Sequence, residues 1–194
     1  MEEIFYEESS REINYLKSQK KHKTLNLLGI ISFVIAIIWA FINFLYFDPA
    51  DGNILVNIIF IIVPVILFFV VGFVFFHFKN FFAIEYDYTF ISGNVKISKV
   101  INGTKRLFLL EFNCYEIELI GYVGSDYYDR ISTNQNLEKM VFIANDSPSE
   151  NKEIYYVLAN TGSSKKLIFI ETTEQFIKLL IKYSNNRVWE ENIK

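Results

Sequence analysis

Three carboxylates in the second half of the chain are the residues best suited to acid–base chemistry. Asp126 and Asp129 lie in a polar stretch at residues 121–137, and Glu138 follows it. Two carboxylates in one cleft can act as general acid and general base when their surroundings separate their pKa values. Acidic side chains are, however, usually solvated at the surface. The sequence therefore favours a solvent-exposed role for these residues, with an enzyme of unknown class as the alternative.

The other residue types that support catalysis are too few and too far apart. Cys114 is the single cysteine, and the two histidines, His22 and His77, lie beside apolar segments far from it in the sequence. A cysteine nucleophile needs a histidine base in the same fold, and a metal site needs clustered ligands. The sequence also has no glycine-rich phosphate loop. We therefore expect no catalytic residue, no metal and no cofactor, and we interpret Cys114 as a strand-edge residue.

Two long apolar segments without Asp, Glu, Lys or Arg, at residues 25–47 and 54–78, enclose a short polar loop at 48–53. Each is longer than the roughly 20 residues that a helix needs to cross a bilayer. Backbone groups in lipid must be satisfied within the segment, so each segment should be a helix. The first segment exceeds the apolar core of a signal peptide, and no small-residue cleavage pattern follows it. We predict a retained transmembrane hairpin at residues 25–78.

Basic residues near these segments predict the orientation of the hairpin. Four lysines precede the first segment and Lys79 follows the second, whereas the loop has neither Lys nor Arg. Because Lys and Arg are enriched on the cytoplasmic side, both termini should be cytoplasmic and the protein should lie in the cell (inner) membrane. Residues 1–24 then form a cytoplasmic juxtamembrane segment. Ser9 and Glu12 match a helix capping box, and this helix is either interfacial or the start of the first transmembrane helix.

Small and polar side chains form one stripe along the first apolar segment, because their spacing of three or four residues matches the helical period. The stripe comprises Asn26, Gly29, Ser32, Ala36, Ala40 and Asn43. Such a surface lets a second helix approach closely in lipid. We expect it to pack on the second segment, with Asn43 facing Asn57 and sharing a hydrogen bond. The alternative is that the stripe joins two copies of the protein.

From residue 83 the hydrophobic period changes from that of a helix to the two-residue alternation of strands. Ile84, Tyr86 and Tyr88, for example, alternate with Glu85 and Asp87. Turn-forming residues divide this region into seven predicted strands, at residues 84–90, 95–101, 105–112, 114–120, 138–144, 154–159 and 165–171. Residues 121–137 should be a long loop.

An amphipathic helix at residues 173–184, capped by Thr172 with Gln175, should complete a domain at residues 83–194. Seven antiparallel strands followed by one helix are the element order of a pleckstrin-homology-like (PH-like) fold. In that fold two sheets form a partly open barrel and the helix closes one end; a two-sheet sandwich with a packed helix is the alternative. The predicted fold class is therefore a membrane α-helical hairpin joined to an α+β domain of seven antiparallel strands.

Short motifs along the whole chain resemble a known family. They are Phe5-Tyr6-Glu7, Ile84-Glu85-Tyr86-Asp87-Tyr88 with Gly93, Lys105-Arg106-Leu107, Lys182-Tyr183 and Arg187-Val188. The chain resembles a family of small two-helix membrane proteins of Gram-positive bacteria, a domain of unknown function. It is also similar to bacterial PH-like domains on transmembrane anchors, which implies scaffolding or binding rather than catalysis.

One candidate site follows from this resemblance, at four basic residues around the predicted turn Asn102-Gly103. They are Lys96, Lys99, Lys105 and Arg106. In lipid-binding PH domains, basic residues at such hairpins hold headgroup phosphates; the default interpretation is that they protect strand edges from aggregation. The net charge of −3 gives no general attraction to nucleic acid. We expect a protein or peptide partner at an exposed sheet edge, with anionic-lipid recognition as the alternative.

Overall fold

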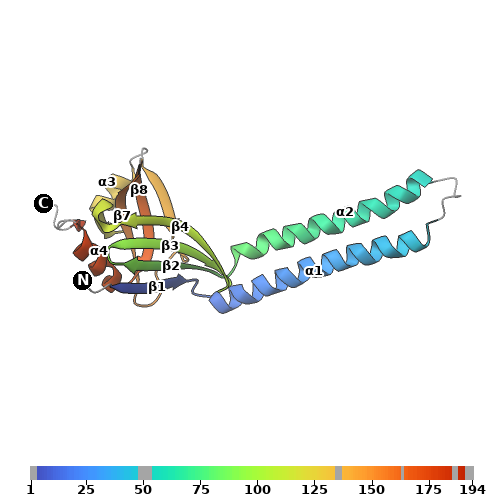
Figure 1. The fold of residues 1–194 in the computed structure, drawn as a ribbon, viewed down its shortest axis with the longest axis horizontal. Coiled ribbons are helices and arrows are strands. Elements are labelled where there is room, and N and C mark those ends of the chain that lie inside the picture. The colour runs from blue at the N-terminus through green and yellow to red at the C-terminus, as the bar shows by residue number, and fades with distance from the viewer. Residues whose placement is uncertain (1–3, 48–53, 134–136, 163, 185–187, 191–194) are drawn as a thin grey trace. The chain divides into compact units, whose positions relative to one another are not determined.

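The computed structural model of the chain describes residues 4–47, 54–133, 137–162, 164–184 and 188–190. The chain divides into two compact units, which are shown in Figure 1. One unit, Leu16–Ala83, contains the two long helices, and the other, the β domain, combines Met1–Tyr15 with Ile84–Lys194. The β domain therefore takes in residues from both sides of the helical unit along the chain.

The helical unit consists of α1 (Tyr15–Leu45), α2 (Ile54–Phe78) and a short 3-10 helix, η1 (Lys79–Phe81). Both long helices are long and apolar enough to cross a membrane. α2 has the predicted bounds, whereas α1 ends at Leu45 and begins at Tyr15, well before the apolar segment. The lysine-rich residues therefore continue the apolar helix and do not form a separate interfacial helix.

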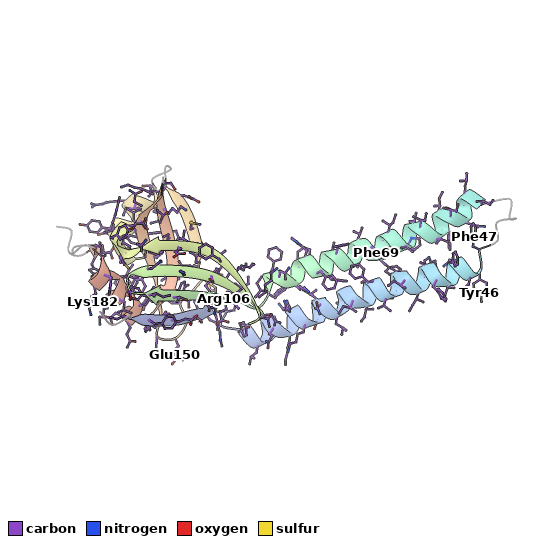
Figure 2. All side chains as sticks on the ribbon, viewed as in Figure 1. Tyr46, Phe47, Phe69, Arg106, Glu150 and Lys182 are labelled. Carbon is purple, nitrogen blue, oxygen red and sulfur yellow. The ribbon has the colours of Figure 1, made fainter. Side chains whose placement is uncertain are left out.

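Small residues bring α1 and α2 together. The buried residues of α1 are Gly29, Ser32 and Ala36. The buried residue of α2 is Gly72, and the ring of Phe33 packs against Phe69 with 5.1 Å between centroids (Figure 2). This part of the predicted stripe therefore faces α2 of the same chain.

Sheet A contains four antiparallel strands in the order β1-β2-β3-β4. Their bounds are β1 (Phe5–Arg11), β2 (Ile84–Ile91), β3 (Asn94–Ile101) and β4 (Lys105–Asn113). Three of these strands were predicted, but β1 was not. The expectation of a helix capped by Ser9 and Glu12 was wrong, because Ser9 lies in β1 opposite Asp87 of β2.

Sheet B has the strand order β5-β7-β8-β6. Its strands are β5 (Ile117–Tyr122), β6 (Glu138–Phe142), β7 (Glu153–Thr161) and β8 (Ser164–Thr172). A 3-10 helix, η2 (Cys114–Glu116), precedes β5, and α3 (Asp126–Ser132) lies within the segment that was predicted to be a loop. Over the described residues the domain thus has eight strands rather than seven, and the two sheets do not form a closed barrel. The prediction of an all-antiparallel fold was also wrong, because β6 pairs with β8 in parallel.

The core of the β domain lies between the two sheets and α4 (Glu174–Tyr183). Its largest fully buried side chains include Tyr88, Phe90 and Phe112 of sheet A and Phe176 of α4. A smaller cluster, with Leu167 of β8 at its centre, lies on the other face of sheet B and includes residues of α3. β8 is therefore covered on both faces, which agrees with its continuous apolar sequence.

The N-terminus of α4 differs from the prediction. Thr173, not Thr172, is the N-cap residue, and its side chain makes no capping bond to its own helix. Its backbone N–H is bonded instead to Glu8 of β1. The predicted capping box of Thr172 and Gln175 was therefore wrong, because a carboxylate from a distant strand takes its place.

Candidate functional site

The four basic residues around turn 102–103 are divided between the two faces of sheet A. Residues directly opposite each other on neighbouring strands share a face, and successive residues along a strand alternate. The register places Lys96 and Arg106 on the outer face, and Lys99 and Lys105 on the face of Tyr86. The register shift between β3 and β4 inserts its extra residue in β4, so β3 stays regular and Lys96 and Lys99 do not converge.

The two outer-face cations already have carboxylate partners. A guanidinium nitrogen of Arg106, labelled in Figure 2, lies 2.6 Å from Asp87 and 3.4 Å from Glu7. The ammonium of Lys96 lies 3.6 Å from Glu111. A phosphate on this face would have to compete with these carboxylates. Within the described chain, no ion pair engages Lys99 or Lys105, so these two cations are the part of the basic cluster that remains available.

The three carboxylates considered for acid–base chemistry lie on different elements. Asp126 and Asp129 are exposed in the first turn of α3, where negative charge interacts favourably with the helix N-terminus. Glu138 begins β6 and lies 3.9 Å from the ammonium of Lys166. Each of these residues thus has a structural role in its own element.

Cys114 is buried in η2, between β4 and β5, and is not part of a strand. Burial raises the pKa of its thiol to about 12, so the thiol stays protonated at neutral pH. His22 and His77 lie on α1 and α2, in the other unit. The structure therefore keeps the cysteine and the histidines in separate units, as their sequence positions implied.

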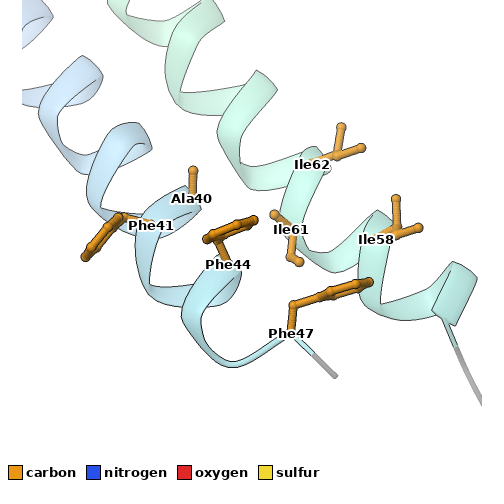
Figure 3. A pocket seen from close by; sticks show the side chains of 7 residues that line it. All are labelled: Ala40, Phe41, Phe44, Phe47, Ile58, Ile61 and Ile62. Atoms are coloured by element: carbon orange, nitrogen blue, oxygen red, sulfur yellow. The ribbon is translucent and has the colours of Figure 1, made fainter. Parts of the chain in front are cut away.

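The polar end of the predicted helix stripe lines hollows between α1 and α2. Asn43 and Asn57 line one of them together, and the amide nitrogen of Asn43 donates to the carbonyl of Trp39 at 2.8 Å. A larger apolar hollow of about 600 Å³ lies beside it (Figure 3). It is lined by Ala40, Phe41, Phe44, Phe47, Ile58, Ile61 and Ile62. The two asparagines thus lie together, and the hydrogen bond between them stays a prediction.

The β domain has a groove beside α4. One part, of about 350 Å³, is lined by Tyr122, Tyr155, Glu174, Ile177, Lys178, Ile181 and Trp189. A second part, of about 370 Å³, is lined by Tyr122, Asn151, Lys152, Glu153, Tyr155 and Glu174. The two parts share three residues and form one depression between α4, β5 and β7, which we call the α4 groove.

Three aromatic rings form the wall of the α4 groove opposite α4. Tyr122 lies 5.0 Å from Tyr155 and 5.2 Å from Trp189, measured between ring centroids, and the indole is nearly perpendicular to the Tyr122 ring. Burial raises the pKa of Tyr155, and its hydrogen bond with Tyr122 and the nearby Glu153 and Glu174 raise it further. The phenol of Tyr155 is therefore neutral at physiological pH.

Trp189 is held in this wall by the residues next to it. The N–H of Ile120, in β5, donates to the carbonyl of Val188 at 2.6 Å, and Trp189 forms a parallel bridge with Ile120. Residues 188–190 thus cover the free edge of β5.

The carboxylate of Glu190 also holds residues 188–190 in place. It is buried and accepts hydrogen bonds from the N–H of Tyr122 (3.1 Å), the hydroxyl of Ser125 (2.7 Å) and the hydroxyl of Tyr156 (2.8 Å). It fits because residue 121 is glycine: a Cβ there would lie 2.1 Å from a Glu190 oxygen. A glycine inside a strand marks a close approach of this kind, but Gly121 was assigned to the predicted loop, and only the structure places it in β5.

Sequence reasoning missed the α4 groove because its walls come from β5, β7, α4 and the C-terminal segment. Tyrosine is abundant in the chain, with 12 residues, but abundance does not tell which rings meet.

The two sheets and the terminal helix define the β domain as a PH-like domain, joined in one chain to two helices that are apolar enough to span a membrane.

Comparison with known families agrees with this class. The family model described as a bacterial PH-like domain (DUF6106) matches residues 14–190, about nine-tenths of the chain. The chain belongs to this family, whose function is unknown. Comparisons with curated proteins and with solved structures gave no significant match.

Proposed function

We propose that the protein is a membrane-anchored binding module and not an enzyme. α1 and α2 cross the cell membrane, both termini are cytoplasmic, and the β domain binds a protein or peptide partner as an adaptor or scaffold. The observation that carries the proposal is the α4 groove, a depression lined by five aromatic or apolar side chains and five polar or charged ones. A concave surface that combines aromatic side chains with polar groups is the default candidate for a binding site.

The anchoring part of the proposal is supported by the surface of the helical unit. Large apolar side chains are exposed along α2 and along the apolar part of α1, for example Ile37 and Phe41 of α1 and Phe60 and Leu67 of α2. A surface of this kind is unfavourable in water and favourable in lipid. The lysines at the start of α1 and Lys79 after α2 support a cytoplasmic location for this end of both helices, because Lys and Arg are enriched on the cytoplasmic side.

Site-specific photocrosslinking in native membranes tests the binding function. A photoreactive amino acid replaces Ile181, which lines the α4 groove, in the full-length protein. The matched control carries it at Lys96, on the outer face of sheet A. We expect one reproducible adduct from position 181 that is absent from position 96. Repeated absence of any adduct at position 181, with the protein intact in the membrane, would contradict the function.

Cysteine labelling tests the orientation. Single cysteines replace Asp51, which lies between α1 and α2 in the sequence, or Ser147, in the β domain, in a Cys114→Ser background. An impermeant reagent added to intact cells should label position 51 and leave position 147 unlabelled. Labelling of position 147 from outside the cell would overturn the proposed cytoplasmic location of the β domain.

Recognition of anionic lipid is the second candidate function, and the free ammonium groups of Lys99 and Lys105 favour it. Both lie on one face of sheet A, and the register places them opposite Tyr86 and Ile101. A titration of short-chain phosphatidylglycerol into the full-length protein in zwitterionic micelles tests it. Amide shifts around these lysines should be lost in the Lys99→Ser/Lys105→Ser variant. Unchanged shifts in that variant would exclude this candidate.

A further inference from the structure

We propose that the α4 groove binds the guanidinium group of an arginine side chain presented by the partner. This inference rests on the proposed function and names the chemistry that the partner must offer. It follows from two features of the groove: an aromatic wall, and two carboxylates at its rim, of which one has no ion-pair partner among the described residues and the other is held only by an exposed lysine.

The aromatic wall offers ring faces to a cation. The faces of Tyr and Trp rings are electron-rich and attract cations at distances up to about 6 Å from the ring centroid. Tyr122 is 39% exposed, and Trp189 is partly exposed beside it. Because the phenol of Tyr155 stays neutral, its ring adds to the wall without adding a charge.

Carboxylates lie at the rim, where a cation in the groove would reach them. Glu153 and Glu174 both line the part of the groove next to Tyr155. In the described residues, Glu153 has no ion-pair partner. Glu174 is paired only with Lys178, at 2.8 Å, one helical turn further along α4, and both side chains are more than two-thirds exposed. An exposed pair of this kind contributes little to stability, so an incoming cation can replace Lys178.

The other lysine of the groove, Lys152, is directed elsewhere. Its ammonium donates to the carbonyl of Ser9 at 2.5 Å and lies 3.9 Å from Glu8, and its side chain is only 15% exposed. Its charge is therefore compensated within the fold. The rim of the groove keeps an excess of negative charge, which disfavours anions and favours a cation.

Arginine fits this combination better than lysine does. A guanidinium is planar, stacks on aromatic rings and can bond a carboxylate with two parallel N–H groups, whereas an ammonium is a compact, strongly hydrated charge. Stacked on the ring of Tyr122 or on that of Trp189, a guanidinium would lie in the same groove as Glu174 and Glu153.

Fluorescence of Trp189 tests the proposal in the full-length protein. The Trp39→Phe change leaves Trp189 as the only tryptophan, since the chain has two. The purified protein in neutral micelles is titrated with acetyl-Gly-Arg-Gly-amide and, separately, with the citrulline peptide, which has the same shape without the charge. We expect saturable quenching with at least fivefold tighter binding of the arginine peptide.

Substitutions at the rim of the α4 groove provide the second part of the test. Glu153→Gln/Glu174→Gln should reduce the affinity for the arginine peptide to that for the citrulline peptide, whereas Glu111→Gln, on sheet A, should leave it unchanged. Equal binding of the two peptides, or an unchanged preference in the double variant, would overturn the inference. If crosslinking at position 181 still captures a partner in that case, only the arginine assignment fails and the binding function stands.

Discussion

The carboxylate of Glu8, on β1, accepts hydrogen bonds from the backbone N–H (3.0 Å) and the hydroxyl (2.6 Å) of Thr173, the N-cap residue of α4. The hydroxyl of Thr172 donates to the same carboxylate at 2.5 Å. The first N–H groups of a helix have no partner within the helix, and negative charge is favourable there. β1 thus supplies the cap that the sequence of α4 does not provide.

The first prediction follows from this contact. Glu8→Ala removes the acceptor of four buried or half-buried donors, the N–H of Thr173 and the hydroxyls of Tyr6, Thr172 and Thr173, so we expect the β domain to lose about 2–4 kcal/mol of unfolding free energy. Urea unfolding of the full-length Trp39→Phe protein, followed by Trp189 fluorescence, measures this loss. The matched control is Glu7→Ala, on the opposite face of the same strand, which should cost at most about 0.5 kcal/mol because its only ion pair is exposed. Equal losses for both variants would contradict the capping role.

The sequence predicted α2, the seven later strands and α4 well, because each carries an apolar pattern of the right period. β1 was missed because its inward-facing residues include Glu8 and Ser10 as well as Tyr6. The residues of β1 therefore show no alternation of apolar and polar side chains. The strand forms because it pairs with β2, which lies more than 70 residues later in the chain.

For the candidate sites, too, the sequence predicted only what local patterns determine. The placement of Lys96 and Lys99 on opposite faces follows from strand parity, which is a local property of the sequence. That Arg106 bonds to Asp87, or that Trp189 lies beside Tyr122, depends on contacts across the fold. Local sequence patterns contain no information about such contacts.

The second prediction concerns pH and Glu171, which is fully buried in β8. Burial alone would raise the pKa of this carboxyl, but hydrogen bonds from Ser10 (2.5 Å), Ser149 (2.5 and 2.8 Å) and Asn145 outweigh it, and the pKa is lowered from 4.5. The folded state therefore binds fewer protons than the unfolded state, and stability rises with pH in this range. The contribution is complete above the ordinary carboxyl pKa and is lost as the pH falls through the lowered value.

Glu171→Gln should therefore lower the unfolding free energy at neutral pH by about 1–3 kcal/mol, and the difference from the unmodified protein should shrink on acidification. Urea unfolding at a series of pH values between neutral and about 3 measures this difference. Glu150→Gln, at an exposed position labelled in Figure 2, is the control and should show no pH-dependent difference. A Glu171→Gln difference that is constant with pH would refute the assigned sign.

The third prediction concerns the close approach of Gly121 and Glu190. The Cβ of Gly121→Ala would lie 2.1 Å from the Glu190 carboxylate and 2.7 Å from the Tyr156 hydroxyl. We expect the change to release residues 188–190 from β5, to shift Trp189 emission to longer wavelength and to cost about 1–3 kcal/mol. Because Glu190→Ala removes the same contact, the double variant should be less destabilised than the sum of the two single changes. Strict additivity would show that the two residues act independently.

The fourth prediction concerns the packing of α1 on α2 at Gly72. A Cβ there would lie 3.0 Å from the ring of Phe33 and 3.3 Å from the carbonyl oxygen of Gly29. Helices in lipid associate through close packing of small residues and lack a hydrophobic drive to come together. Gly72→Leu should therefore move α2 away from α1, and Gly72→Ala should have a smaller effect because the Phe33 ring can shift slightly.

Spin-label distances in a Cys114→Ser background measure this movement, with labels at the exposed positions Ile37 of α1 and Leu67 of α2. We expect the distance between the labels to increase in Gly72→Leu and to stay the same in Val70→Leu, because Val70 is exposed and away from the packed face. The β domain forms its own unit, so its urea midpoint should not change in either variant. An unchanged label distance in Gly72→Leu would show that the helices are not held together at this glycine.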